Sequence, residues 1–491
     1  MKSKKEYILG IDQGTTGTTA LLADTSGKVV ASYTQDFPQY FPQPGWVEHH
    51  LDEIWQSTQK AITTLLASHS IDPKYILCIG ITNQRETVGL WRSQDAKPLH
   101  PAIVWQCRRT EKLCQTHRDK EDWIYQKTGL VLDPYFSATK IKWMLEQTNT
   151  TNTNDIFCGT MNTYIAWKLT SGKSFVTDVT NASRTQLMNT ETGNWDDDLC
   201  DLFTVPRTIL PPIVACDETI GKTSGLGFLP DGIPISGMAG DQHAALFGQA
   251  CFTPMQGKCT YGTGAFVLIN TGDKRILSQH RMLSTIAWKI QNQVTYALEG
   301  SVFIAGAVVG WLRDGLGLIQ SSKEIESLAS SVKDSDGVYF VPALTGLGAP
   351  HWHTKARGTI TGLHRGTNKA HIARAALEGI AFQVHDVIKA MEKDTGQKLR
   401  SLRIDGGASQ NDLLMQFQAD LLGQTLSQSA TIETTALGVC WMAGLGIGLW
   451  KSMDEIQGLY QEKHQYNPLM PTDKKKQLLL NWEKALQKTM L

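Results

Sequence analysis

Two turns rich in glycine and threonine, one in each half of the chain, constrain the fold more than any other feature of the sequence. Residues 7–24 read YILGIDQGTTGTTALLAD, and residues 258–270 read KCTYGTGAFVLIN. In each, a β-rich run leads through the turn into a second β-rich run, which is typical of a β-hairpin. Successive backbone N–H groups around such a turn bind anions, and threonine hydroxyls add further donors. The pair of turns predicts a phosphate chain held between two related domains, and hence an ATP-using enzyme.

The first turn also carries Asp12, a carboxylate suited to holding Mg²⁺ through water beside the phosphates. The chain has 491 residues, too many for a single hydrophobic core. Its strands and helices alternate until a helix that begins near Asp241 ends at about Gly248, and the hairpin pattern starts again at Lys258. We therefore expect an α/β protein with a domain boundary near residue 250.

Composition excludes several classes of protein. Lys plus Arg and Asp plus Glu number 47 each, so net charge gives no reason to expect a nucleic-acid or membrane partner. Residues 300–318 are apolar but are interrupted by Arg313 and Asp314, which favours a buried helix over a membrane span. Nine cysteines, an odd number without any Cys-x-x-Cys pair, favour a reduced, cytoplasmic protein over a disulfide framework.

Hydrophobic periodicity predicts the main elements. We expect a three-stranded meander over 7–35, a hairpin over 285–299, and a strand over 402–404 that ends in a double-glycine turn. A helix from about Leu413 follows this turn. The strand, the double-glycine turn and the start of the helix together predict an edge where a nucleotide docks. The remaining expected elements are a strand over 75–82, helices over 50–68, 303–314 and 370–395, and a Lys-rich helix formed by the last forty residues.

A polar cluster follows the strand over 75–82, at residues 83–86 (NQRE). Ligand groups of open α/β sheets lie at the carboxyl ends of strands. Arg85 donates hydrogen bonds and Glu86 accepts them, so together they suit a substrate with several hydroxyls. Asp241 and Gln242 follow a glycine and stand at the start of a predicted helix. Two simpler alternatives stay open, namely a structural Arg85–Glu86 ion pair and an N-cap role for Asp241.

Over about residues 5–460 the chain resembles the FGGY family of carbohydrate kinases, and within it the members that phosphorylate glycerol. The matching motifs are DQGTT at 12–16, GITNQRET at 80–87, AIVWQCRRT at 102–110, DPYFS at 133–137, AGDQ at 239–242, YGTG at 261–264 and DGGA at 405–408. The resemblance implies two ribonuclease-H-like domains, as in actin and hexokinase, with the active site in the cleft between them. Residues 1–250 would bind glycerol and phosphate, and residues 251–491 the nucleotide.

The resemblance also implies a role for each site residue. Asp241 would accept the proton of the attacking hydroxyl, and Asp12 would lie near Mg²⁺. The other predicted glycerol contacts are Arg85, Glu86, Trp105, Tyr135, Gln242 and Phe266. The predicted ATP contacts are Thr15, Thr16, Gly17, Thr263, Gly306, Gly310, Gly407 and Asn411. The implied reaction converts ATP and glycerol to ADP and sn-glycerol 3-phosphate, for glycerol catabolism and glycerolipid synthesis.

Some features depart from the family pattern or leave the function open. Gly310 stands where glycerol-phosphorylating relatives usually have a polar residue beside the nucleotide. The family suggests a homodimer or homotetramer. Two alternative functions remain, a kinase of the same family for another polyol or a ketopentose, and a non-kinase ATPase of the actin superfamily.

Overall fold

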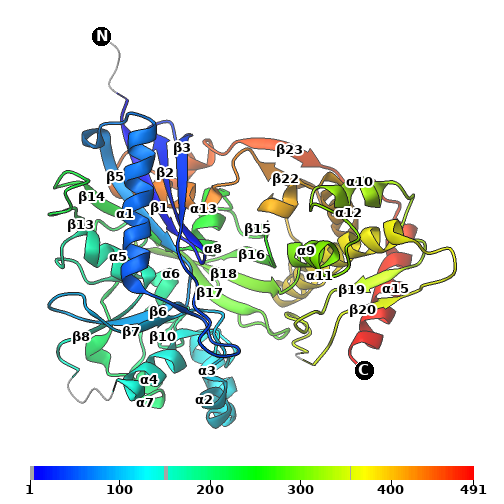
Figure 1. Cartoon of the computed structure of the whole chain (residues 1–491), viewed down its shortest axis with the longest axis horizontal. Helices are drawn as coiled ribbons and strands as arrows, with labels where there is room; N and C mark the ends of the chain where they lie inside the picture. Colours follow the sequence, from blue (N-terminus) through cyan, green and yellow to red (C-terminus); the bar gives the residue numbers. More distant parts are fainter. Residues whose placement is uncertain (1–4, 149–152, 354) are drawn as a thin grey trace.

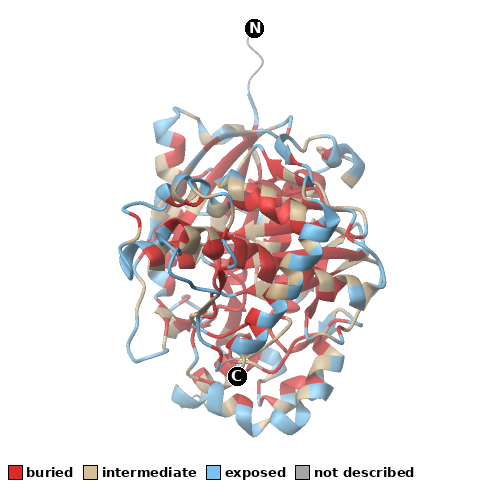
Figure 2. Cartoon of the chain, turned by 90° about the vertical axis from the view of Figure 1, so that its right-hand side faces the viewer, coloured by how far each residue is buried: buried red, intermediate tan, exposed pale blue. Residues whose placement is uncertain are grey.

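The structure is a computed structural model of the chain that describes residues 5–148, 153–353 and 355–491. It contains two large β-sheets, one built from residues before 250 and the other from residues after 250, with helices packed around them (Figure 1). Buried residues, red in Figure 2, fill the middle of the molecule, and exposed residues lie mainly on outer helices and loops.

The first sheet has six strands in the order β13-β14-β5-β1-β2-β3. Strands β1, β5 and β14 run parallel, and their last residues Gln13, Asn83 and Gly240 are partners in register. The segments that follow these three strands therefore meet at one edge of the sheet. The strands are β1 (Tyr7–Gln13), β2 (Gly17–Asp24), β3 (Val29–Asp36), β5 (Ile76–Asn83), β13 (Gly221–Lys222) and β14 (Pro234–Gly240).

Helix α13 (Thr434–Gly446) belongs to the second half of the chain but packs on the first sheet. Beneath it lie three glycines that are register partners, Gly10, Gly80 and Gly237. A Cβ atom at Gly80 would lie 2.3 Å from the carbonyl oxygen of Val439. The close approach of helix and sheet thus requires glycine at this position.

The opposite face of the first sheet packs against α1 (Leu51–Ser68) and α5 (Met161–Leu169). Leu9 and Ile11 of β1 share a hydrophobic cluster with residues of both helices, whereas Ile8 belongs to the cluster that contains α13. This alternation is the two-residue period of a strand buried on both faces.

The second sheet has seven strands in the order β17-β18-β16-β15-β21-β22-β23. The long helix α11 (Lys369–Thr395) packs against it and contributes to a separate hydrophobic core. The strands are β15 (Gln256–Tyr261), β16 (Ala265–Gly272), β17 (Leu283–Ile290), β18 (Gln293–Val302), β21 (Ser401–Asp405), β22 (Leu426–Ser429) and β23 (Glu462–Tyr466).

The other elements complete the two halves. A third sheet of four strands has the order β4-β7-β6-β8. The remaining strands are β4 (Glu48–His49), β6 (Val88–Arg92), β7 (Pro98–Ile103), β8 (Ile156–Thr160), β9 (Thr177–Asp178), β10 (Met188–Asn189), β11 (Asn194–Trp195), β12 (Ile213–Val214), β19 (Tyr339–Val341) and β20 (Thr359–Thr361). The remaining helices are α2 (Glu111–Thr116), α3 (Glu121–Thr128), α4 (Ser137–Gln147), α6 (Val179–Ala182), α7 (Asp197–Leu202), α8 (Asp241–Gly248), α9 (Gly306–Asp314), α10 (Glu324–Ser330), α12 (Asp412–Leu422), α14 (Met453–Gln457) and α15 (Thr472–Thr489).

The predicted α/β class and most of the predicted elements are confirmed, including the meander, the hairpins and the helix over 370–395. The end of the chain differs, because the Lys-rich helix is limited to α15 and strand β23 (EKHQY) precedes it. Four of the five residues of β23 are exposed, as suits a charged edge strand, and this composition concealed the strand in the sequence.

Two further expectations concern organisation. Residue 250 lies between the end of α8 and the start of β15, while α13 returns to the first sheet. The division into domains at 1–250 and 251–491 stays a prediction. Within the described residues, no helix is long and apolar enough to cross a membrane.

Candidate active site

The charged residues predicted to bind substrate meet where β1, β5 and β14 end. Asp12 is the penultimate residue of β1, Arg85 and Glu86 follow β5, and Asp241 follows β14. Glu86 has a φ of 60° and thus lies in the left-handed region, which marks a tight turn directly after Arg85. The parallel register of the three strands therefore brings the predicted base and the predicted polyol ligands together.

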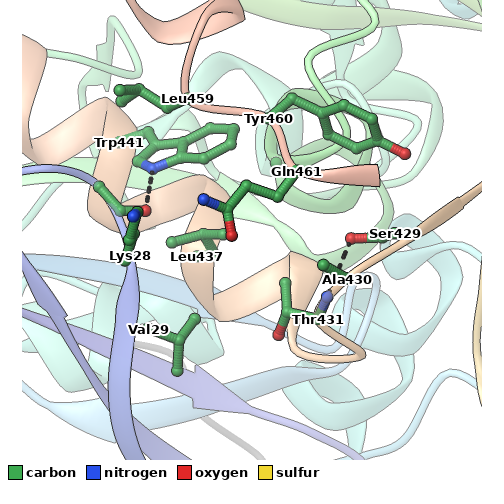
Figure 3. Close-up of a pocket in the computed structure, with 12 residues that line it drawn as sticks. Lys28, Val29, Ser429, Ala430, Thr431, Leu437, Trp441, Leu459, Tyr460 and Gln461 are labelled. Atoms are coloured by element: carbon green, nitrogen blue, oxygen red, sulfur yellow. Dashed lines mark hydrogen bonds between the residues drawn. The ribbon is translucent and has the colours of Figure 1, made fainter. Parts of the chain in front are cut away.

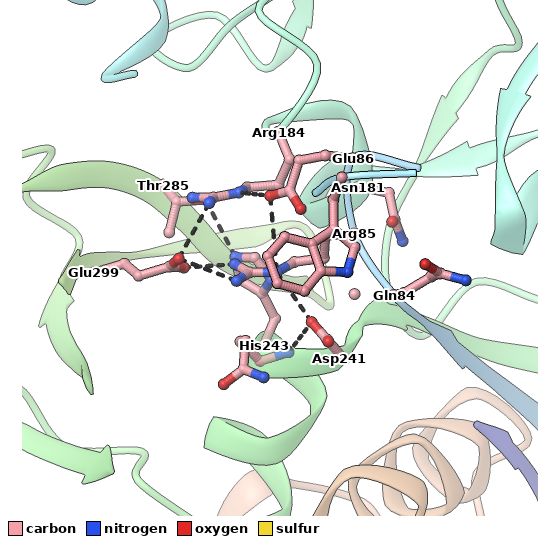
Figure 4. A network of polar contacts seen from close by, with 12 residues as sticks. Gln84, Arg85, Glu86, Asn181, Arg184, Asp241, His243, Thr285 and Glu299 are labelled. Carbon is pink, nitrogen blue, oxygen red and sulfur yellow. Dashed lines mark hydrogen bonds and ion pairs between the residues drawn. The ribbon is translucent and has the colours of Figure 1, made fainter. Parts of the chain in front are cut away.

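Arg85 is the centre of a polar network at this edge (Figure 4). Its Nε lies 3.0 Å from Oδ1 of Asp241, and its Nη1 and Nη2 donate to the two carboxylate oxygens of Glu299 at 2.5 and 3.0 Å. Arg184 donates from Nη2 to Glu299 at 3.1 Å and from Nε to Oε1 of Glu86 at 2.6 Å. A continuous chain of charges thus runs from Asp241 to Glu86.

Exposure distinguishes the members of this network. The side chains of Glu299 and Arg184 are 0% exposed, whereas that of Asp241 is 30% exposed. Burial raises the pKa of Glu299, but the charges of Arg184 and Arg85 outweigh burial and hold it far below its usual range. Burial raises the pKa of Glu86 despite Arg184 and Arg85. The ionised form of Glu299 is therefore favoured, and Asp241 is the most exposed of the three carboxylates in the network.

The simpler alternatives for these residues fit the structure less well. Gly240, not Asp241, occupies the N-cap position of α8, although Oδ1 of Asp241 accepts the N–H of Gln242 at 2.7 Å. Arg85 and Glu86 approach each other only to 4.0 Å, farther than either lies from its other ionic partners. The two side chains serve different partners and do not form a closed pair.

Glu299 and Arg184 were not predicted from the sequence. Glu299 lies in β18 (QVTYALEGSV), where a fully buried carboxylate interrupts an apolar strand. A buried charge of this kind requires a partner of opposite charge, which is the signal that would have found it. Arg184 follows α6 in a polar loop and carries no comparable signal.

Gln242, a predicted glycerol contact, is held by a lysine that was also missed. The Nζ of Lys258 donates to Oε1 of Gln242 and, at 2.8 Å, to Oγ1 of Thr260. Lys258 is buried, and desolvation lowers its pKa. Because Lys258 lies in β15 and Gln242 in α8, this contact is a second tie between the two halves.

Aromatic side chains form the apolar wall beside the network. The rings of Trp105 and Tyr135 pack edge to face with 5.7 Å between centroids. The indole Nε1 of Trp105 donates to Oγ1 of Thr15 at 2.9 Å, which joins this wall to the first phosphate turn. The buried Lys140 donates to the backbone oxygen of Tyr135 at 2.7 Å and fixes that residue.

Phe266 lies on β16 of the second sheet. Leu268 of the same strand pairs with Glu299, and Phe266 is two residues away, so Phe266 and Glu299 belong to the same face of the sheet. Phe266 is partly exposed on that face. It therefore stands on the side of the second sheet that supplies Glu299 to the network.

Both predicted phosphate turns are closed by backbone hydrogen bonds. The N–H of Gly14 donates to the oxygen of Gly17 at 2.9 Å, and the N–H of Gly262 donates to that of Gly264 at 2.9 Å. Thr16 and Thr263 are exposed. The turns therefore leave these two threonines available to a ligand, whereas the hydroxyl of Thr15 is engaged with Trp105.

The second phosphate turn is hydrogen-bonded to the start of α9. The oxygen of Thr263 accepts the N–H groups of Ala305 and Ala307 at 2.9 and 3.0 Å. A Cβ at Gly306 would lie 2.6 Å from the oxygen of Gly262, whereas a Cβ at Gly310, one turn farther along the helix, would meet nothing within 4 Å. Gly306 thus permits the contact, and Gly310 leaves open space.

The predicted nucleotide edge also lies beside the second turn. A Cβ at Gly406 would lie 2.5 Å from the oxygen of Tyr261, so the double-glycine turn passes directly over the end of β15. Gly407 is exposed with open space around it. Oδ1 of Asn411 accepts the N–H of Leu414 at 2.8 Å as the N-cap of α12, which leaves its amide nitrogen available.

Asp12 has the character of a cation ligand. Desolvation, followed by the negative charges of Asp241 and Glu433, raises the pKa of Asp12 to about 8. Among the described residues, no three His, Cys, Asp or Glu side chains are close enough together to hold a metal ion by themselves. The carboxylate fits Mg²⁺ that is held mainly by phosphates and water, the usual mode for this ion.

A cavity of about 310 Å³ lies away from these residues, at the far end of the β1–β2 hairpin from the first phosphate turn (Figure 3). Its walls come from both halves of the chain and include Lys28, Ser429 and Trp441. The indole of Trp441 donates to the oxygen of Gly27 at 3.1 Å. None of the predicted site residues lines this cavity.

The chain matches known proteins over its whole length. It is 52% identical to a glycerol kinase of Bdellovibrio bacteriovorus over 489 residues, covering 98% of this chain and 99% of the relative. It is 50% identical to a glycerol kinase of Parabacteroides distasonis, covering 99% and 98%. The crystal structure of Plasmodium falciparum glycerol kinase with ADP superposes with a TM-score of 0.93 at 36% identity, covering 99% of both chains.

More distant structures share the fold. A gluconate kinase from Lactobacillus acidophilus superposes with a TM-score of 0.89 at 24% identity, covering 99% of both chains. Models of the N-terminal and C-terminal domains of FGGY carbohydrate kinases match residues 7–248 and 257–447. The chain belongs to the FGGY family of carbohydrate kinases.

Proposed function

We propose that this protein is a glycerol kinase, which transfers the γ-phosphoryl group of ATP to glycerol and releases sn-glycerol 3-phosphate and ADP. One observation carries the proposal: Trp105 packs on Tyr135 and also donates to Thr15 of the first phosphate turn. This bridge puts a wall suited to a short carbon chain next to the phosphates. The resemblance to glycerol kinases over the whole chain supports it.

The predicted site residues match the polar hydroxyls of glycerol on one side and its apolar carbon chain on the other. Arg85, Glu86, Tyr135 and Asp241 pair with hydroxyls, while Trp105 and Phe266 pack on the carbon chain. Gln242 adds a contact from α8. The edge-to-face pair of Trp105 and Tyr135 supports a short carbon chain over the longer chain of a pentulose, which would need a roomier pocket.

Chemistry at this site depends mainly on position. Asp241, partly exposed beside Arg85, accepts the proton of the terminal hydroxyl as that oxygen attacks the γ-phosphorus. Phosphoryl transfer needs alignment and charge neutralisation more than a strong base. Mg²⁺ held near Asp12 neutralises phosphate charge when bound. Thr15, Thr16, Gly17 and Thr263 lie at the two phosphate turns, and Gly306, Gly310, Gly407 and Asn411 border the adenosine.

An ATP-consumption assay with and without glycerol tests the proposal. We expect ADP release only with glycerol and Mg²⁺, and phosphate on a terminal carbon of the product. ATP consumption that ignores glycerol would favour a non-kinase ATPase of the actin superfamily. Faster turnover of erythritol or a ketopentose would favour another FGGY kinase.

We also infer a cytoplasmic homodimer or homotetramer, with no nucleic-acid partner and no membrane insertion. All nine cysteines are free and buried, which suits a reducing compartment. Light scattering of the purified protein tests the oligomeric state, and a single mass near that of one chain would contradict it.

A further inference from the structure

Glu299 is the charged residue that the second half of the chain contributes to the polar network of Figure 4, where Thr285 of β17 is an uncharged residue from the same half. Its two carboxylate oxygens accept from both terminal nitrogens of Arg85, and one of them also accepts from Arg184. The side chain is 0% exposed, so no substrate atom reaches it. Its effect on a ligand must pass through the two arginines.

We propose that Glu299 is a positioning residue for glycerol, which sets the orientation of Arg85 directly and that of Glu86 through Arg184. This inference rests on the proposed glycerol kinase function. The geometry gives the reason. A guanidinium has five N–H groups, and Glu299 accepts one from each terminal nitrogen of Arg85, while Nε of Arg85 lies 3.0 Å from Oδ1 of Asp241 as an ion pair.

The arrangement fixes which part of Arg85 lies beside Asp241. Because the bidentate pair with Glu299 holds the guanidinium plane, it keeps Nε of Arg85 3.0 Å from Oδ1 of Asp241, where glycerol would bind. On the other side, Nε of Arg184 holds Oε1 of Glu86 at 2.6 Å and leaves Oε2 for a hydroxyl. One buried carboxylate thus orients two of the three charged glycerol ligands, Arg85 and Glu86.

Stability alone does not explain such a network. Four charged side chains that are almost wholly buried lose much hydration, and replacing a buried ion network by apolar groups is often neutral or favourable. Nη1 of Arg184 is buried with no hydrogen-bond partner among the described residues. A network selected for stability would give Nη1 of Arg184 a hydrogen-bond partner. A network selected to orient Arg85 and Glu86 can retain this group, although an unpaired buried N–H lowers the stability of the fold.

The test separates glycerol binding from ATP binding. Glu299→Gln keeps the shape but removes the charge and one of the acceptors. We expect the KM for glycerol to rise at least tenfold, with the KM for ATP changed less than threefold, because among the described residues the hydrogen-bond and ion-pair partners of the Glu299 side chain are Arg85 and Arg184. Isothermal titration with glycerol alone should show the same loss of affinity, and this readout does not depend on turnover.

A matched control is Glu378→Gln. Glu378 is also buried and pairs with Arg374 at 2.7 Å, but on α11, within the second core. Its loss should lower the unfolding temperature without changing either KM. Equal KM changes in both variants would mean that loss of any buried ion pair loosens the enzyme, and the positioning role would be lost.

Two further variants test the proposal if Glu299→Gln does not fold. Glu299→Asp retains the charge but is one methylene shorter, so it cannot pair with both nitrogens of Arg85 and should raise the KM for glycerol several-fold. Glu299→Ala should regain glycerol affinity in 0.1 M formate, whose carboxylate fits between the arginines, and not in 0.1 M chloride. An unchanged KM in Glu299→Asp or in Glu299→Gln overturns the proposal. A wild-type protein without glycerol-dependent activity would instead overturn the proposed function.

Discussion

The Nε of Arg85 lies 3.0 Å from Oδ1 of Asp241, so the predicted base and a predicted glycerol ligand form one ion pair. Asp241→Asn keeps an oxygen acceptor for Arg85 but cannot take a proton. We expect kcat to fall by roughly 10²–10⁴-fold, the usual value of a general base, with little change in glycerol affinity. Steady-state kinetics and glycerol titration measure the two effects. Near-normal turnover would show that Asp241 only orients Arg85.

Discrimination between polyols follows from the same pairing. A site whose buried donors and acceptors match substrate hydroxyls rejects analogues that lack one. We expect kcat/KM for 1,2-propanediol and ethylene glycol to be at least about 10²-fold below that for glycerol. Arg85→Ala should raise the KM for glycerol by about 10–100-fold, the value of a charge-assisted hydrogen bond. Equal activity on the diols would mean that Arg85 has a structural role only.

Two glycines one turn apart in α9 should respond oppositely to alanine. At Gly306 the new Cβ would lie 2.6 Å from the oxygen of Gly262, so Gly306→Ala should displace the second turn and raise the KM for ATP about tenfold. Gly310 has open space, and Gly310→Ala should leave that KM unchanged and stabilise the helix by about 0.5–1 kcal/mol. Kinetics and thermal unfolding check the pair, and matching effects would refute it.

Asp12 should make the metal-free protein less stable as pH rises. Its folded pKa is about 8, above its ordinary value of 3.8, so the folded state holds a proton that the unfolded state releases. Stability therefore falls between these two values, by at most about 1.4 kcal/mol per pH unit. Asp12→Asn removes this cost.

Unfolding in denaturant at pH 5 and pH 8, with EDTA, measures the effect of Asp12. The difference in free energy between the variant and the wild type should be larger at pH 8. Mg²⁺ with ATP should reduce it by stabilising the ionised wild-type carboxylate. A difference that does not depend on pH would show that Asp12 is an ordinary exposed acid.

Much of the site could be predicted because its parts follow strand ends that are visible in the sequence. The hairpin of β1 and β2 and the strand before Arg85 are marked by their side-chain patterns, and parallel register then brings their ends together. Glu299 could not be placed in this way. It acts across about 200 residues of sequence, and only the pairing of the two halves shows its partners.

The sequence also could not predict which sheet α13 packs against. The helix is apolar on all sides, so its sequence indicates burial but not against which sheet. The glycines that receive it, Gly10, Gly80 and Gly237, lie in three separate strands. Each is unremarkable alone, and their shared role depends on register.

Domain closure is the remaining prediction, and the two phosphate turns are its basis. The turn at 14–17 belongs to the first sheet and the turn at 262–264 to the second, so one ATP molecule that contacts both must draw the halves together. Glycerol bound between the predicted contacts Arg85 and Phe266 would also have to contact both halves. Closure would exclude water from the transferred phosphoryl group.

We expect glycerol with a non-hydrolysable ATP analogue to reduce the radius of gyration in small-angle scattering. The ligands should also slow amide exchange in both turns, whereas the C-terminal helix α15 serves as an internal reference that does not change. Scattering and exchange that are identical with and without the ligands would show a site already assembled, and closure would then have no part in the reaction.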